Sequence, residues 1–216
     1  MPLLKEYQSK DRSVNVLFSF PLFESAVDRL AAVSSQLGTN ALSVMIDHVD
    51  QLPYVEAIYA ESGGYPPRVF IKIDSNYGRA GVTIDGPELP VLIDALLAGE
   101  KDKWLVLHGV YTHAGQSYKA RRLGDAMYTL SNEFINARIA AGKIREKSPD
   151  HAPLVLSVGA TPTATTIQSP WFLEESSIVV PKGNPRGTIR SFEDEVSELW
   201  GTWQNEGYVL EVHAGV

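Results

Sequence analysis

The sequence of 216 residues contains no cysteine. This absence excludes disulfide bonds, thiolate nucleophiles and cysteine-ligated zinc sites. Basic residues are also few, since 19 lysine and arginine residues are outnumbered by 26 aspartate and glutamate residues and the net charge is -7. Because the chain has no basic tract that could neutralise phosphates, we expect no nucleic-acid partner and no anionic membrane surface as a partner.

Long apolar runs are missing as well. No window approaches the roughly eighteen consecutive apolar residues of a membrane-spanning helix, and the first residues, MPLLKEYQSKDRS, lack the charged start and apolar core of a signal peptide. We therefore expect a cytoplasmic protein. A hydrophobic content of 44% and a charged content of 21% are ordinary for a globular chain. The length suits one domain, although a complete eight-unit barrel typically needs about 250 residues.

Apolar runs and helical spacing alternate along the chain. Strands are predicted at residues 14–20, 42–46, 69–73, 104–111, 154–158 and 208–212. Helices are predicted at 3–7, 23–37, 49–62, 87–97, 118–147 and 192–203. Such alternation indicates a parallel sheet with right-handed crossovers.

The sequence also predicts burial, helix ends and a loop for some of these elements. The run from Val14 to Phe20 is typical of a buried strand, and Gly99 is a helix stop after 87–97. In the long helix, Ile135 and Ile139 are expected on the buried face. Residues 169–192 contain three prolines and two glycines, which predicts an inserted loop with at most one edge strand.

The stretch VFIKIDSNYGRAGV, residues 69–82, combines a buried strand with charge. Lys72, Asp74 and Arg79 lie at or just beyond its end. Burying charge is costly unless the charge is paired or bound to something, so these residues line the floor of a pocket or form a structural ion pair. From spacing alone the ion pair is favoured.

Three further strand-end segments carry polar groups. They are LHGVYTHAGQSY at 107–118, SVGATPT at 157–163 and EVHAG at 211–215. The imidazole of His113 can stack on or hydrogen-bond a flat ring, or it can be structural, while His108 lies inside its strand and is expected in the core. The small residues 159–163 offer backbone N–H groups and hydroxyls to an anion, or Pro162 makes a plain turn there.

These four motifs, in this order, resemble those of the alanine-racemase-like barrel of pyridoxal phosphate enzymes, and specifically its D-serine dehydratase and D-threonine aldolase branch. The resemblance implies an α/β fold, an incomplete (β/α)8 TIM-type barrel with parallel strands. It implies a single partial pyridoxal phosphate-binding domain over residues 1–216.

The resemblance also implies roles for individual residues, with pyridoxal phosphate as the cofactor. Arg79 lies near the cofactor ring and steadies its phenolate oxygen, and His113 contacts the ring. Tyr111 is a supporting donor or a rim aromatic. His213 lies on the side of the pyridine nitrogen.

The phosphate cup of the family corresponds here to Thr161, Thr163 and Gly215. The family's imine-forming lysine lies on its first strand, in a context that neither Lys5 nor Lys10 shares. The C-terminal β domain, which carries the zinc-binding histidine and cysteine, is also unmatched. We therefore expect no covalent cofactor, no metal and no catalytic residue in this chain, and Lys72 lies on the wrong strand to substitute.

The activity implied by the resemblance is a lyase reaction on a small D-amino acid through a Schiff base, by elimination or retro-aldol cleavage. A homodimer is the implied assembly. Three alternatives remain at this point: a catalytically inactive fragment or remnant, a non-covalent pyridoxal phosphate or phosphate-binding module, and a plain structural barrel.

Overall fold

The computed structural model describes residues 1–121, 123–167, 201–203 and 205–213. At its centre is a parallel sheet whose six strands lie in chain order. The strands are β1 (Val16–Pro21), β2 (Leu42–Ile46), β3 (Arg68–Ile73), β4 (Val106–Thr112), β5 (Val155–Val158) and β6 (Val209–Val212). Every neighbouring pair is parallel, which confirms the fold class predicted from the alternating pattern.

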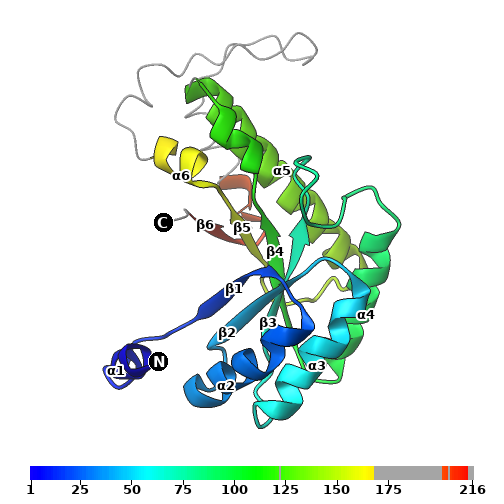
Figure 1. Cartoon of the computed structure of the whole chain (residues 1–216). Helices are drawn as coiled ribbons and strands as arrows, with labels where there is room; N and C mark the ends of the chain where they lie inside the picture. Colours follow the sequence, from blue (N-terminus) through cyan, green and yellow to red (C-terminus); the bar gives the residue numbers. More distant parts are fainter. Residues whose placement is uncertain (122, 168–200, 204, 214–216) are drawn as a thin grey trace.

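Helices connect the strands and lie mainly on one face of the sheet. Figure 1 shows α2 to α5 side by side along this face, whereas α1 stands apart beyond the start of β1. The helices are α1 (Pro2–Gln8), α2 (Val27–Leu37), α3 (Leu52–Glu61), α4 (Glu88–Lys101), α5 (Leu123–Lys147) and α6 (Thr161–Ile167). Short 3-10 turns are η1 (Glu24–Ala26), η2 (Val49–Gln51) and η3 (Gly115–Lys119). Within the described residues, no helix combines the length and hydrophobicity that crossing a bilayer requires.

The main core fills the space between the sheet and the helices. Alternate strand residues such as Val44, Ile71 and Leu156 are fully buried there, against Leu92 of α4 and other apolar helix residues. The opposite face, which is the interior of the barrel, holds a smaller apolar cluster of Met45, Phe70, Tyr111 and Val155, with Leu17 beside it. Since successive strand residues point to opposite faces, one strand sequence supplies both layers.

The prediction that the first strand is buried was wrong. β1 is not a buried strand: its residues are half-buried or exposed, and the side chain of Phe20 is 65% exposed. The reason is its position, because β1 pairs only with β2 among the described strands and therefore lacks a neighbour on its other side. β6 is likewise an exposed edge, so the six strands form an open barrel.

Two helix predictions were also wrong. Gly99 does not end α4 but lies inside it, where a Cβ would come within 2.5 Å of the Trp104 ring. A close contact therefore explains this glycine. On α5, Ile135 and Ile139 are exposed, since the helix turns Leu130, Phe134 and its alanines toward the sheet instead.

Two further predictions concerned residues 159–163 and residues 169–192. Residues 159–163 are not a plain turn, because α6 begins at Thr161 directly after β5. The expected loop and edge strand at 169–192 lie outside the described residues, as does most of the expected helix at 192–203.

Candidate active site

A row of polar side chains crosses the barrel interior near the carboxyl ends of four strands. Lys72 of β3 is in register with Tyr111 of β4, Tyr111 with Ser157 of β5, and Ser157 with Glu211 of β6. Registered neighbours in a parallel sheet point to the same face, so all four line the interior. We call Lys72, Tyr111, Ser157 and Glu211 the interior row. In barrels of this architecture the carboxyl ends of the strands carry the chemistry.

Two histidines lie at the ends of strands in the same layer. The imidazole of His213 stacks on Tyr111 with a centroid distance of 4.2 Å and an interplanar angle of 13°. The ring of His113 is nearly parallel to that of His213, 6.2 Å away. The structure therefore brings together three of the residues chosen from sequence: Tyr111, His113 and His213.

Burial keeps both histidines neutral. It lowers the pKa of His213 to about 4, with the charges of His113 and Lys72 as further causes. It also lowers the pKa of His113, although a hydrogen bond to the carbonyl of Gly159 opposes this effect. Burial raises the pKa of the Tyr111 phenol, so Tyr111 and the two histidines are neutral rings near pH 7.

Lys72 is the buried cation of the row. Its side chain is only 4% exposed, and its Nζ lies 4.9 Å from the centroid of the Tyr111 ring. Burial is the largest cause that lowers its pKa, followed by the charge of Arg79. The Lys72 carbonyl accepts a hydrogen bond from the Val82 amide, whereas its side-chain amine forms no hydrogen bond or ion pair with the described residues and lies against the Tyr111 ring.

The ion pair favoured from spacing does not form. The carboxylate of Asp74 instead accepts hydrogen bonds from the amides of Tyr77 and Gly78, at 2.9 and 3.1 Å, and so closes the turn after β3. Arg79 is exposed and lies over the Tyr77 ring at 5.6 Å. Its charge still reaches the row, because it lowers the pKa of Lys72 and of Tyr111.

Gly159 joins the two histidines. His113 Nδ1 is 3.1 Å from the Gly159 carbonyl oxygen, which can only accept, so the ring donates from Nδ1. Gly159 has φ +131°, and a Cβ there would lie 2.3 Å from the carbonyl oxygen of His213. Only glycine permits this backbone and this close approach of the β5 and β6 ends.

Glu133 was not predicted from sequence. It is fully buried on α5, and its Oε1 accepts a hydrogen bond from the Ala114 amide at 2.6 Å. Burial raises its pKa to about 7, opposed by the amides of Ala114 and Gly159, by Lys72 and by the Thr163 hydroxyl. A carboxylate within the buried stripe that contains Leu130, Phe134 and Ala137 was the signal that could have revealed it.

The expected phosphate cup is only partly described. The Thr161 hydroxyl accepts a hydrogen bond from the Tyr118 hydroxyl at 3.1 Å. The Thr163 hydroxyl is buried and bonded to Ala160, whose amide donates to it at 2.8 Å. Gly215 lies outside the described residues.

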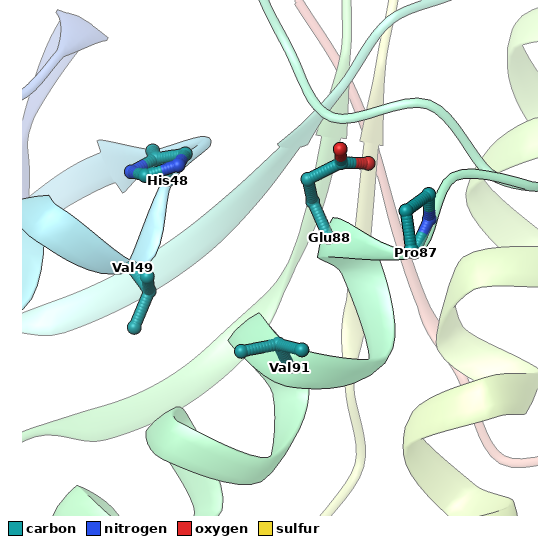
Figure 2. A pocket seen from close by; sticks show the side chains of 5 residues that line it. All are labelled: His48, Val49, Pro87, Glu88 and Val91. Atoms are coloured by element: carbon teal, nitrogen blue, oxygen red, sulfur yellow. The ribbon is translucent and has the colours of Figure 1, made fainter.

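A separate hollow of about 210 Å³ lies away from the row. Figure 2 shows His48 and Val49 on one side of it and Pro87, Glu88 and Val91 of the α4 start on the other. None of the residues chosen from sequence lines this hollow. Among the described residues, no cluster of histidine and acidic side chains could hold a metal ion.

The sequence that carries the interior row matches a known protein family. Residues 27–174, more than half of the chain, match the sequence model of the alanine racemase N-terminal domain. The chain belongs to this family. This confirms the family expected from the motifs, and the parallel fold agrees with it.

Individual proteins are also similar to this chain in sequence or in structure. The chain is 29% identical to D-serine dehydratase of Saccharomyces cerevisiae over 76% of its own length, and 34% identical to D-serine dehydratase of Schizosaccharomyces pombe over 77%. It covers 39% of each of these relatives. In structure it resembles D-threo-3-hydroxyaspartate dehydratase of Delftia sp. HT23, with a TM-score of 0.60, 26% identity, and coverage of 75% of this chain and 41% of that one.

The residues present fit a flat cofactor with polar edges. The His213 Nε2 atom is buried without a hydrogen-bond partner among the described residues, and it lies in a ring already stacked on Tyr111. The unpaired edge of His213 favours a bound ring that has a polar edge. The space beside Gly115, in contrast, is filled by the Tyr77 ring, which would lie 2.5 Å from a Cβ at that position.

Proposed function

We propose that the interior row and its two histidines bind pyridoxal phosphate, and that this chain is the cofactor-binding part of a D-amino-acid lyase of the D-serine dehydratase type. The observation that carries the proposal is the stack of His213 on Tyr111 beside His113, in a chain of this family. Stacked aromatic rings prefer centroid separations of about 4.5 to 7 Å, so the site suits a further flat ring.

Each residue would hold a different part of the cofactor. His113 would contact the ring, Arg79 would stabilise its phenolate oxygen, and His213 would lie toward its nitrogen. Thr161 and Gly215 would bind the phosphate. Thr163 shapes the turn through Ala160, since its hydroxyl is bonded there.

Bound pyridoxal phosphate supplies an electron-accepting ring that stabilises negative charge at the α-carbon of an amino acid. The chain's own groups create the environment for that ring. Neutral His113 and His213 provide lone pairs or N–H groups without adding charge. Lys72 adds a single cation beneath the Tyr111 ring, and Glu133 keeps the loop of His113 in place.

The substrate class proposed is a small D-amino acid with a leaving hydroxyl on its β-carbon. D-serine would yield pyruvate and ammonia, whereas an aldolase would cleave D-threonine to glycine and acetaldehyde. A homodimer is the proposed assembly.

The test is the binding of pyridoxal phosphate to the chain, followed by a product assay with both amino acids. We expect saturable, non-covalent binding that is weakened in His113→Ala and retained in His48→Ala, an exposed histidine outside the row. Because no catalytic residue is expected in this chain, we expect binding without turnover. Pyruvate from D-serine or glycine from D-threonine would show that the chain itself supplies the chemistry, and absence of binding would reject the proposal.

A further inference from the structure

Three side chains, from β5, β6 and the residue directly after β6, form a continuous hydrogen-bonded chain. Ser157 Oγ lies 2.6 Å from Glu211 Oε1 and 3.1 Å from His213 Nδ1. Ser157 and Glu211 are in register on neighbouring strands, and His213 is two residues beyond Glu211. The sheet itself therefore places the serine between the carboxylate and the imidazole.

The protons of this chain can be assigned from donor capacity. An ionised carboxylate has only acceptor sites, so the single hydroxyl proton of Ser157 goes to Glu211. Ser157 Oγ must then accept from His213, and Nδ1 is the ring nitrogen that donates. Because burial keeps this imidazole neutral, Nε2 carries a lone pair and no proton.

The Nε2 atom has no way to satisfy that lone pair within the described residues. It is buried and makes no hydrogen bond of ordinary geometry there, and the nearby Gly159 backbone only partly opposes the lowering of the His213 pKa. The ring cannot turn freely to find one, since one face stacks on Tyr111 at 4.2 Å and Nδ1 is held by Ser157. A buried acceptor without a donor is unfavourable, so the arrangement is complete only when a donor group approaches.

We propose that Ser157 and Glu211 fix the tautomer of His213, so that Nε2 is a hydrogen-bond acceptor for an N–H or O–H group of the bound ligand. Ser157 and Glu211 are positioning residues, because they act through the imidazole. The identity of the donor rests on the proposed function: for pyridoxal phosphate it is the ring nitrogen in its protonated form.

His113 has the same tautomer, although a different hydrogen-bond partner fixes it. Its Nδ1 donates to the Gly159 carbonyl, so its Nε2 also carries a lone pair. Two nearly parallel imidazoles, 6.2 Å apart, thus present acceptors and no donors on these atoms. A ligand edge made only of acceptors would be rejected, and one with a donor would be selected.

The first experiment reads the tautomer in the protein without ligand. Histidine ring nitrogens are labelled with 15N and their resonances are recorded at about pH 8, above the ordinary imidazole pKa of about 6.5. His213→Gln assigns the signals. We expect a protonated Nδ1 and an unprotonated Nε2 in the wild type, and a shift of the population toward the Nε2–H form in Ser157→Ala.

Controls separate a positioning role from general loss of structure. Ser43→Ala removes another buried serine of the same sheet, whose hydroxyl donates to Asn15. We expect this variant to leave the His213 signals unchanged. Ser157→Thr retains the hydroxyl, so we expect it to show the wild-type tautomer. A wild-type ring protonated on Nε2, or a Ser157→Ala tautomer identical to that of the wild type, overturns the proposal.

The second experiment tests the ligand that the acceptor selects. Pyridoxal phosphate is compared with its carbocyclic analogue, in which a C–H group replaces the ring nitrogen. We expect the wild type to prefer pyridoxal phosphate by roughly tenfold, the effect of one good hydrogen bond, and Ser157→Ala to lose this preference. Equal affinity in the wild type contradicts the donor assignment. Failure of both compounds to bind rejects the proposed function, while the tautomer measurement stands independently.

Discussion

Glu133 of α5 and Ala114, two residues beyond the end of β4, are joined by a hydrogen bond of 2.6 Å from the Ala114 amide to the carboxylate. Glu133 is fully buried. The bond ties α5 to the loop that carries His113, so Glu133 helps to fix the position of that imidazole.

The first prediction concerns the pH dependence of this carboxylate. The folded-state pKa of Glu133, about 7, lies above its ordinary value of 4.5, so the folded protein binds more protons between these values. The contribution of Glu133 to the free energy of unfolding is fully present below about pH 4.5 and is lost as the pH rises through about 7. Relative to Glu133→Gln, the wild type should lose on the order of 3 kcal/mol of unfolding free energy across this window.

Urea unfolding at several pH values measures this difference. Glu146→Gln, an exposed change on the same helix, is the matched control and should show little pH-dependent difference from the wild type. Parallel stability curves for wild type and Glu133→Gln would show that Glu133 titrates normally in the folded protein.

The second prediction concerns Gly159. Replacement by alanine places a Cβ 2.3 Å from the His213 carbonyl oxygen at φ +131°. We expect a loss of about 2 kcal/mol or more in stability, because both strain and a steric clash are introduced. Gly142→Ala, in α5 with open space around it, should instead stabilise by about 0.5–1 kcal/mol. Thermal unfolding compares them, and equal effects would contradict the close β5–β6 approach.

The third prediction concerns Lys72. Because burial lowers its pKa, the unfolded chain binds more protons as pH approaches 10.5, and the stability of the wild type rises toward that value. Lys72→Met, which keeps the volume without the charge, should be at least as stable as the wild type at pH 7, and its advantage should shrink at alkaline pH. Lys101→Met, on the exposed side of α4, controls for the lost charge. A large destabilisation at pH 7 would instead indicate a favourable ionic contact of Lys72.

The fourth prediction concerns the anchoring of β6. Arg145 of α5 donates to the carbonyls of Glu206 and Gly207 and lies over the Tyr208 ring at 3.8 Å. Arg145→Met should cost about 2–3 kcal/mol, because charged hydrogen bonds and a cation–π contact are lost together.

Arg138→Met offers the matched comparison, since it removes a partly exposed ion pair with Glu206. This change should cost less than about 1 kcal/mol. Hydrogen exchange of β6 amides should increase only in Arg145→Met. Equal exchange in both variants would contradict the anchoring role.

Strand and helix order could be predicted because the apolar runs and helical spacing are local properties of the chain. β2 occupies the predicted residues, and Tyr111, His113 and His213 meet as their strand-end positions suggested. The exposure of Phe20 could not be predicted, since a run of apolar residues does not reveal which strand lies at an edge.

Contacts between residues far apart in the sequence could not be predicted from local patterns. Gly99 resembles a helix stop, yet its reason is the Trp104 ring that packs against it. Ser157 and His213 are 56 residues apart, and only the β5–β6 register brings them together. Such register is a property of the assembled sheet.

The most direct measurement is the binding of pyridoxal phosphate to the purified chain, followed by absorbance and equilibrium dialysis, in the wild type, His113→Ala and His48→Ala. We predict saturable binding of one cofactor per chain, weakened by roughly tenfold or more in His113→Ala and unchanged in His48→Ala. The colour should be removed by dialysis, with or without borohydride. No saturable binding, or binding that His113→Ala leaves intact, would contradict the assignment of the Tyr111, His113 and His213 cluster as the cofactor site.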